Sequence, residues 1–267
     1  MKNKPIVCYL FTIFDKIEYI KNFRDYYLKF NAGIDHDLII CFKLLDSNQI
    51  NNIINELSDI KFYNFVDPHN KNDFDFGSYK RIAKIHYDKQ ILFMNSHSYP
   101  ICDNWLLKLI NHSSHNSLIG TSASNESILF SIKLKKYYKI FSYLLKNFLF
   151  NKKFNSFPNP HIRTSSFLVN GQVFFDYIKD IKIQNKVNTW EIESGKKSLT
   201  NFFKSKNYNI YVVNSDGKKF TEKNYIYSET YCYSKQSKSI ISDKHTRKYL
   251  SLSHEDKNLS QFKVWGK

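Results

Sequence analysis

Glycine, proline and cysteine are all scarce in this chain. With 7 Gly and 5 Pro among 267 residues, the sequence has few turn-forming residues, which argues against a loop-rich all-β design. The four cysteines stand far apart and form no CxxC pair, so neither a disulfide framework nor a zinc site is indicated, and a reducing cytoplasm is expected. No stretch reaches the roughly 18 apolar residues of a membrane span, and the apolar run at 6–14 predicts a core strand rather than a signal peptide.

Several motifs that mark well-known chemistries are also missing. The sequence contains no GxGxxG, no GxxxxGK[ST] and no GxSxG, which excludes the usual dinucleotide, Walker-type and hydrolase signatures. His112 and His115 have HxxH spacing, but no third ligand stands within reach, so we expect a solvated pair rather than a metal site.

Aromatic residues and positive charge are abundant. Hydrophobic residues make up 42% of the chain and aromatic residues 17%, which excludes a disordered protein. The net charge of +16 would attract polyanions, or it reflects a general bias toward lysine. Because the sequence has no RNP string, no KH-type GxxG loop and no arginine-rich arm, nucleic-acid binding is the weaker alternative.

Continuous apolar strands separated by amphipathic helices fill the first half of the chain. Strands are predicted at 6–14, 38–44, 61–66 and 90–94, and helices at 17–30, from 46 onward and at 76–87. This alternation predicts an α/β fold with a mostly parallel sheet and helices on both faces.

The second half is less regular, and no linker divides the chain. We expect a short helix from 103, strands at 117–121, 162–169 and 210–213, and helices at 132–150, 171–178 and 198–206. The chain is therefore expected to form a single domain over 1–267, with halves at 1–100 and 101–267.

The stretch 73–100, DFDFGSYKRIAKIHYDKQILFMNSHSYP, carries the clearest functional signal. An acidic helix start with Gly77 leads into an amphipathic helix and a buried strand, which ends in the polar residues Asn95, Ser96 and His97. Open α/β sheets build ligand sites at such strand ends.

This block, followed by the segments described below, resembles the GT-A fold glycosyltransferases, in particular the family 2-like and rhamnan-synthesis types of bacterial polysaccharide synthesis. The resemblance implies a GT-A-like Rossmann-type sandwich, a nucleotide-sugar donor bound by 1–100, and a glycan or lipid-linked acceptor bound by 101–267. It also implies a hexosyltransferase active in building bacterial surface polysaccharide. A catalytically inactive relative is the alternative.

The usual metal motif of that family is replaced in this chain. Family members commonly carry Asp-x-Asp at the end of the fourth strand, where Asn95, Ser96 and His97 stand here. Asn95 and His97 could still hold Mn²⁺ or Mg²⁺, or lysines could hold the diphosphate without a metal. Metal dependence is left open.

The resemblance also implies which residues meet the donor. Gly77 lets the backbone approach a nucleotide, Lys80 offers charge for phosphate, and Phe14 could stack on a base or belong to the core. An ordinary helix capped by Asp73 or Asp75 is the alternative for the helix start. The donor-side set is Thr12, Phe14, Asp15, Asp67, Asp75, Phe76, Gly77, Lys80, Asn95, Ser96 and His97.

The acceptor side is assigned to residues from the second half. His161, Arg163 and Ser165, on the predicted strand 162–169 or just before it, and Trp105 are expected to contact the acceptor. An inverting transferase needs a carboxylate to deprotonate the acceptor hydroxyl, and Glu193 is the first candidate, with Glu191 as the second. Both glutamates could instead serve a helix end.

Two basic segments complete the prediction. The stretch 131–153 has seven lysines and no acid, so it either lies on an anionic membrane surface at the inner face of the cytoplasmic membrane or packs on the core. In the tail, Arg247 or His245 could close over the donor phosphates, although a capped helix explains that cluster equally well.

Overall fold

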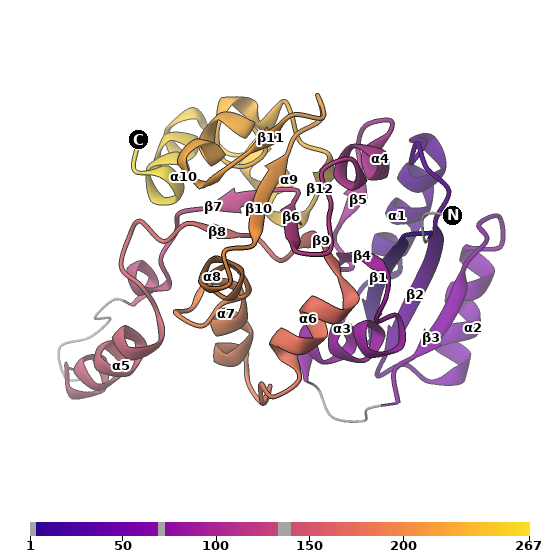
Figure 1. The fold of residues 1–267 in the computed structure, drawn as a ribbon, viewed down its shortest axis with the longest axis horizontal. Coiled ribbons are helices and arrows are strands. Elements are labelled where there is room, and N and C mark those ends of the chain that lie inside the picture. The colour runs from indigo at the N-terminus through magenta and orange to yellow at the C-terminus, as the bar shows by residue number, and fades with distance from the viewer. Residues whose placement is uncertain (1–3, 69–72, 133–139) are drawn as a thin grey trace.

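A computed structural model describes residues 4–68, 73–132 and 140–267. Its main sheet has the strand order β11-β10-β6-β9-β4-β1-β2-β3 and confirms the predicted α/β fold (Figure 1). The strands are β1 (Ile6–Thr12), β2 (Asp37–Lys43), β3 (Tyr63–Val66), β4 (Gln90–Met94), β6 (Ser117–Gly120), β9 (Ser166–Asn170), β10 (Asn209–Val213) and β11 (Lys219–Phe220).

The strand order of the sheet reverses between β1 and β4. From β1 the chain adds β2 and then β3 on one side, all parallel, and then returns to place β4 on the other side of β1, also parallel. β9 runs antiparallel between β4 and β6, and β10 is parallel to β6. In such open sheets a crevice lies outside the carboxyl ends of the two neighbouring strands at which the strand order reverses. Ligands are therefore expected at the carboxyl ends of β1 and β4.

Helices cover both faces of this sheet. Alternate residues of β1 point into two separate cores, with Cys8 on one face and Tyr9 on the other. The helices α1 (Ile17–Lys29), α2 (Ser47–Glu56) and α4 (Trp105–Ile110) pack on one face, and α3 (Phe74–Ile85), α6 (Gly171–Ile178), α7 (Lys186–Ser194) and α8 (Leu199–Ser205) on the other. The remaining elements are β5 (Tyr99–Pro100), β7 (Ala123–Ser124), η1 (Ile128–Ser131), α5 (Ile140–Lys153), β8 (His161–Ile162), η3 (Glu222–Ser228), η4 (Ser234–Gln236), β12 (Ile241–Ser242), α9 (Lys244–Leu250) and α10 (His254–Trp265).

The structure corrects one predicted strand, adds one helix that was not predicted, and describes only part of a third element. The single strand predicted at 162–169 is two short strands, β8 and β9, because the chain turns at 163–165, where Arg163 forms a buried ion pair with Asp243. The segment 186–194 is a helix that the periodicity did not predict, although Asn185 and Asn188 form a capping box at its start. The helix predicted at 132–150 is described only as α5, from 140 to 153, because 133–139 lie outside the described residues.

Candidate active site

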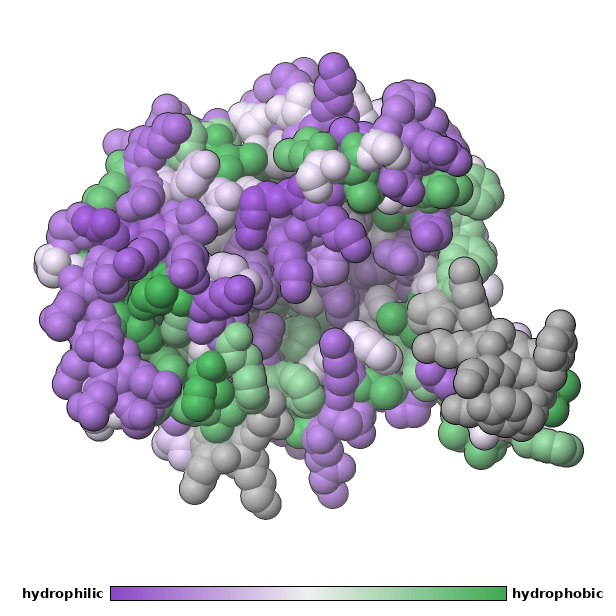
Figure 2. All heavy atoms as spheres, turned by 180° about the vertical axis from the view of Figure 1, so that it is seen from behind, coloured by the Kyte–Doolittle hydropathy of each residue, from purple (hydrophilic) through white to green (hydrophobic). Residues whose placement is uncertain are grey.

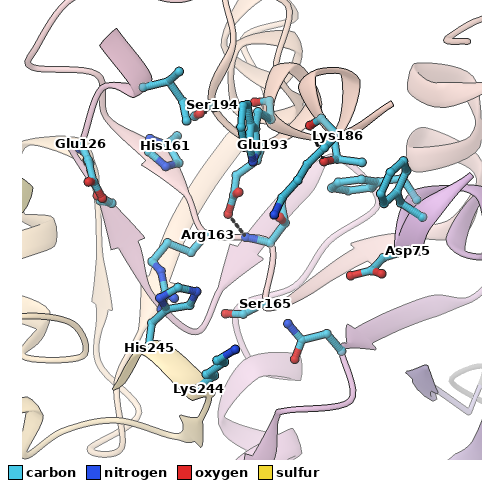
Figure 3. Close-up of a pocket in the computed structure, with 18 of the residues that line it drawn as sticks. Asp75, Glu126, His161, Arg163, Ser165, Lys186, Glu193, Ser194, Lys244 and His245 are labelled. Carbon is cyan, nitrogen blue, oxygen red and sulfur yellow. Dashed lines mark hydrogen bonds between the residues drawn. The ribbon is translucent and has the colours of Figure 1, made fainter. Parts of the chain in front are cut away.

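A cavity of about 530 Å³ opens beyond the carboxyl end of β4. Its walls come from the start of α3, the turn after β4, the segment 161–165, α7 and the start of α9 (Figure 3). Eight of the predicted site residues line it: Asp75, Phe76, Asn95, His97, His161, Arg163, Ser165 and Glu193. The structure therefore brings Asp75 and Glu193, which are nearly 120 positions apart in the chain, into one cavity.

The turn after β4 is held by its own polar groups. The Asn95 side-chain oxygen accepts hydrogen bonds from the His97 amide at 3.1 Å and from the Ser98 hydroxyl at 2.8 Å. The backbone amide of Asn95 donates a hydrogen bond to the Ser165 carbonyl at 3.1 Å. These hydrogen bonds fix the turn after β4 and join it to the segment 161–165.

These contacts bear on the metal site that the family resemblance implies. The Asn95 oxygen already accepts two hydrogen bonds, and His97 offers a ring whose pKa is lowered by burial. Among the residues that the structure describes, no group of three or more His, Cys, Asp or Glu side chains is arranged to hold a metal ion. The donor set at 95–97 therefore does not fit a hard divalent cation, which prefers several carboxylate oxygens.

The end of β1 is joined to the same turn. Asp15 accepts hydrogen bonds from the amide and hydroxyl of Thr12, both at 2.8 Å, and from the Ser96 hydroxyl at 2.6 Å. Thr12, Asp15 and Ser96 thus connect the two strands that flank the crevice, and they do not line the cavity itself. The Phe14 ring is 72% exposed beside them, so it is not a core residue, and its stacking on a base stays a prediction.

Asp75 carries a carboxyl group that is a weaker acid than an ordinary aspartic acid. It stands in the first turn of α3 and points into the cavity (Figure 3). Burial, together with the like charges of Asp15 and Glu193, raises the pKa of Asp75 to about 6. Such a group can exchange a proton near neutral pH, which the sequence pattern did not indicate.

The raised pKa predicts that Asp75→Asn stabilises the protein. The ordinary pKa is 3.8, so the protonated carboxyl stabilises the fold at low pH, and that contribution is lost as the pH rises from about 4 to 6. Asparagine resembles the protonated form at every pH. We expect the variant to gain about 1–3 kcal/mol at pH 7 and nothing at pH 3.5. Urea unfolding of both proteins across this pH range is the measurement, and a constant difference would contradict the assignment.

Glu193 is the carboxylate that α7 brings to the cavity. One of its oxygens accepts a hydrogen bond from the Thr164 amide at 3.1 Å, drawn as the dashed line in Figure 3. The side chain is half-buried and points toward the same space as Lys186, from the first turn of the helix (Figure 3). Glu193 therefore has a fixed position and an oxygen facing the cavity.

Glu191, the second candidate for the base, points elsewhere. It pairs with Lys153 at 2.8 Å and accepts a hydrogen bond from Asn188 at 3.3 Å, and it does not line the cavity. Residues two apart on a helix face opposite sides, so only one of the two glutamates can reach the site. The structure thus places Glu191 outside this cavity, and Glu193 is the glutamate that can act as a base there.

Arg163 lines the cavity, but its guanidinium is engaged by other side chains of the protein. Its guanidinium pairs with Asp243 at 2.8 Å and stacks 3.7 Å from the centre of the Tyr231 ring. Burial alone would raise the pKa of Asp243, but the Arg163 charge holds it well below its usual range. The same carboxylate caps α9 by accepting from the His245 and Thr246 amides, so this pair places the tail against the cavity.

The start of α9 adds groups that the sequence suggested only weakly. Lys244 and His245 line the cavity, as Lys186 does from α7. Arg247 does not line it; it donates to the His97 carbonyl at 3.0 Å and so supports the turn after β4. No ion-pair partner is found for Lys186 or Lys244 within the described parts of the chain. Two lysines can therefore face a ligand, and neither could be singled out in so lysine-rich a sequence.

Trp105 and Asp67 lie in the interior. The Trp105 side chain is 0% exposed and donates to the Phe30 carbonyl, so it offers no surface to an acceptor. Asp67 is buried in ion pairs with Lys43 at 3.2 Å and Arg81 at 2.5 Å, which corrects the expectation that it meets a base.

Gly77 and Lys80 also lie away from the cavity. A Cβ atom on Gly77 would stand 1.9 Å from Asp73 Cγ, so glycine is required for Asp73 to fold back onto α3 rather than for a nucleotide to approach. Lys80 donates to the Lys179 carbonyl and faces a second cavity, which Gly77 also lines. These two donor predictions are not supported.

Comparisons with known proteins find likeness in structure only. No family model matches the chain, and no curated protein matches it. The solved structures similar to it include the glycosyltransferase GlyE of Streptococcus pneumoniae TIGR4 at 10% identity and TM-score 0.44, covering 78% of this chain and 44% of GlyE. They also include the galactosyltransferase LgtC at 10% identity and TM-score 0.42, covering 79% and 73%.

The bifunctional glycosyltransferase WbbM is similar at 12% identity and TM-score 0.41, covering 79% of this chain and 38% of WbbM. The chain thus spans less than half the length of GlyE and of WbbM. A nucleotidyl transferase from Methanothermobacter thermautotroptrophicus is similar to a like degree, with a TM-score of 0.41. Glycosyltransferases are among the similar structures, as the sequence resemblance predicts, but because the TM-scores of these structures lie below 0.5, no activity follows from the likeness.

Proposed function

We propose that this chain is a nucleotide-sugar-dependent glycosyltransferase that transfers a hexosyl group to a glycan or lipid-linked acceptor in bacterial surface polysaccharide synthesis. The observation that supports this most directly is that one cavity at the crevice of the sheet holds a positioned carboxylate, Glu193, and two lysines for which the described residues offer no ion-pair partner. A cavity of about 530 Å³ lies within the range of small-molecule sites.

The proposed reaction uses each of these groups once. Glu193 accepts the proton of the acceptor hydroxyl as its oxygen bonds to the anomeric carbon of the donor sugar. The bond from that carbon to the diphosphate breaks, and its electron pair leaves with the nucleoside diphosphate. Lys186 and Lys244 balance the charge that develops on the departing phosphate.

A panel of nucleotide sugars tests this proposal. The full chain is incubated with UDP-, GDP-, dTDP- and CMP-sugars, and thermal shift and nucleotide release are measured for each. We expect one donor class to raise the melting temperature by mass action and to be turned over slowly by water or by a sugar acceptor. Absence of both effects with every donor would leave the inactive relative as the better description.

The same panel tests the role of divalent metal. Because the 95–97 donor set does not fit a hard cation, we expect Mn²⁺ at 5 mM and EDTA at 5 mM to give donor thermal shifts equal within about 1 °C. A donor shift that appears only with Mn²⁺ would contradict this expectation and would call for ligands other than Asn95.

The proposal includes contact with an anionic membrane through α5. This helix has no buried residue, and its apolar side chains Phe141, Leu144, Leu145 and Phe148 are 84%, 52%, 60% and 57% exposed. It projects from the body of the molecule (Figure 1), and the space-filling view shows apolar surface on that projection (Figure 2). From 127 to 175 the sequence holds no acidic residue. An apolar face beside lysines, without acids, suits a negatively charged lipid surface.

Flotation with vesicles tests the membrane contact. We expect binding to phosphatidylcholine vesicles with 30% phosphatidylglycerol, and a loss of about tenfold or more in Leu145→Glu/Phe148→Glu, since each buried side chain contributes about 1.5–3 kcal/mol. The control Leu28→Glu/Phe262→Glu changes two equally exposed residues elsewhere and should bind as the original chain does. Equal loss in both variants, or equal binding without anionic lipid, would contradict the proposal.

The proposed contact is with the membrane surface. Among the helices of the described residues, none combines the length and the hydropathy that a transmembrane span requires.

A further inference from the structure

A second cavity of about 650 Å³ lies between α3 and the connection from α6 to α7. The two cavities share neighbouring segments: Asp73 and Gly77 line the second one, and the residues between them line the first. In the same way Gln184 lines the second cavity and Lys186 the first. The starts of α3 and α7 therefore form a common border of the two cavities.

The rim of the second cavity is strongly cationic. Lys80, Arg81, Lys84, Lys179 and Lys182 line it, against the single acid Asp73. Both oxygens of that carboxylate pair with Lys43 or Arg81, so its negative charge is compensated locally.

The lysines of the rim differ in how far they are neutralised. Lys179 pairs with Asp176 at 3.0 Å, and Lys80, near Asp180, donates to the Lys179 carbonyl. Lys84 and Lys182 are exposed and have no ion-pair partner in the described residues. Two full positive charges are thus available to a ligand.

The floor of the cavity is apolar. Phe175, Ile181 and Ile183 are half-buried there and pack on the core that lies under α3 and α6. An aromatic and aliphatic floor suits the C–H faces of sugar rings, and the cations above it suit their charged substituents.

We infer that the second cavity binds the anionic portion of an acidic glycan acceptor, whose growing end lies at Glu193. The inference rests on the proposed function and adds the class of the acceptor: a chain that carries phosphodiester or carboxylate groups. Both kinds of acceptor present negatively charged groups that repeat along the chain of sugar residues.

Direct binding tests the site without any transfer reaction. Isothermal titration of the full chain uses three probes at low salt: hexagalacturonate, inorganic tripolyphosphate and a neutral glucan hexamer. We expect one or both anions to bind and the neutral hexamer not to bind. Stronger binding of the galacturonate would indicate carboxylates, and stronger binding of the tripolyphosphate would indicate phosphates.

Matched lysine variants locate the binding. Lys84→Gln/Lys182→Gln removes the two lysine charges that have no ion-pair partner among the described residues, and it should weaken binding of the anion at least about tenfold. The control Lys223→Gln/Lys248→Gln removes two exposed lysines elsewhere and should change the affinity by less than about twofold.

Equal weakening in the two variants would mean that only net charge matters and would overturn the inference, as would failure of both anions to bind. The thermal shift given by a nucleotide sugar should be the same in the Lys84→Gln/Lys182→Gln variant as in the original chain. If only the inference about the second cavity is wrong, a nucleotide sugar still gives a thermal shift. If the proposed transferase function is wrong, no donor gives a thermal shift.

Discussion

Glu193→Gln is expected to lower glycosyl transfer by about 10²–10⁴-fold while leaving donor binding intact, because a positioned general base contributes that factor. Glutamine keeps the size of the side chain and can still accept the hydrogen bond that the Thr164 amide donates at 3.1 Å. It cannot accept the proton of the acceptor hydroxyl. The measurements are the initial rate of transfer with the donor found in the nucleotide-sugar panel, and the thermal shift with that donor.

Glu191→Gln is the matched control for this prediction. It makes the same chemical change two residues away on α7, at a carboxylate that pairs with Lys153 outside the cavity. We expect its rate to stay within about twofold of the original chain, with a loss of stability of about 0–1 kcal/mol from the half-exposed ion pair. A fall in rate of equal size in both variants would show that charge on α7, rather than a base at Glu193, matters.

Lys43→Met is expected to cost about 3–5 kcal/mol of unfolding free energy, because it removes one partner from a buried ionic cluster. Lys43 is 1% exposed at the end of β2 and contacts Asp67, Asp73 and Ser78. Methionine fills a similar volume, so the loss reports the removal of the Lys43 charge from beside the two carboxylates. Urea unfolding at pH 7 measures it.

Two further variants separate this effect from a general change of surface charge. Lys61→Met replaces an exposed lysine at no cost beyond about 0.5 kcal/mol. Adding Asp67→Asn to Lys43→Met should recover part of the loss, because it removes one of the uncompensated buried charges. Equal stability of Lys43→Met and Lys61→Met would show that the cluster contributes nothing to the fold.

The first half of the fold was predictable because its signals are local. β1 is buried along six of its seven residues and reads as an unbroken apolar run, and α2 begins with a capping box at Asp46. Such patterns need no knowledge of distant residues. The place of the site followed from the same reasoning, since the polar residues after β4 had to lie at an edge where strands end.

The parts that were mispredicted depend on contacts between distant residues. The break between β8 and β9 follows from the pairing of Arg163 with Asp243, which are 80 positions apart. The role of Gly77 follows from the folding back of Asp73, and the burial of Trp105 from a hydrogen bond to Phe30. Lys186 and Lys244 stand among 40 lysines and arginines, so only their positions in space single them out.

The turn at 95–98 has a consequence for attempts to re-engineer this chain. The side-chain oxygen of Asn95 closes the turn, and the Ser96 hydroxyl donates to Asp15, so these polar groups already form hydrogen bonds within the protein. An aspartate at 95 would accept the same two hydrogen bonds as Asn95 does and would be turned into the loop in the same way. The single substitution Asn95→Asp would thus leave the carboxylate turned into the loop, and we expect it not to create a metal site.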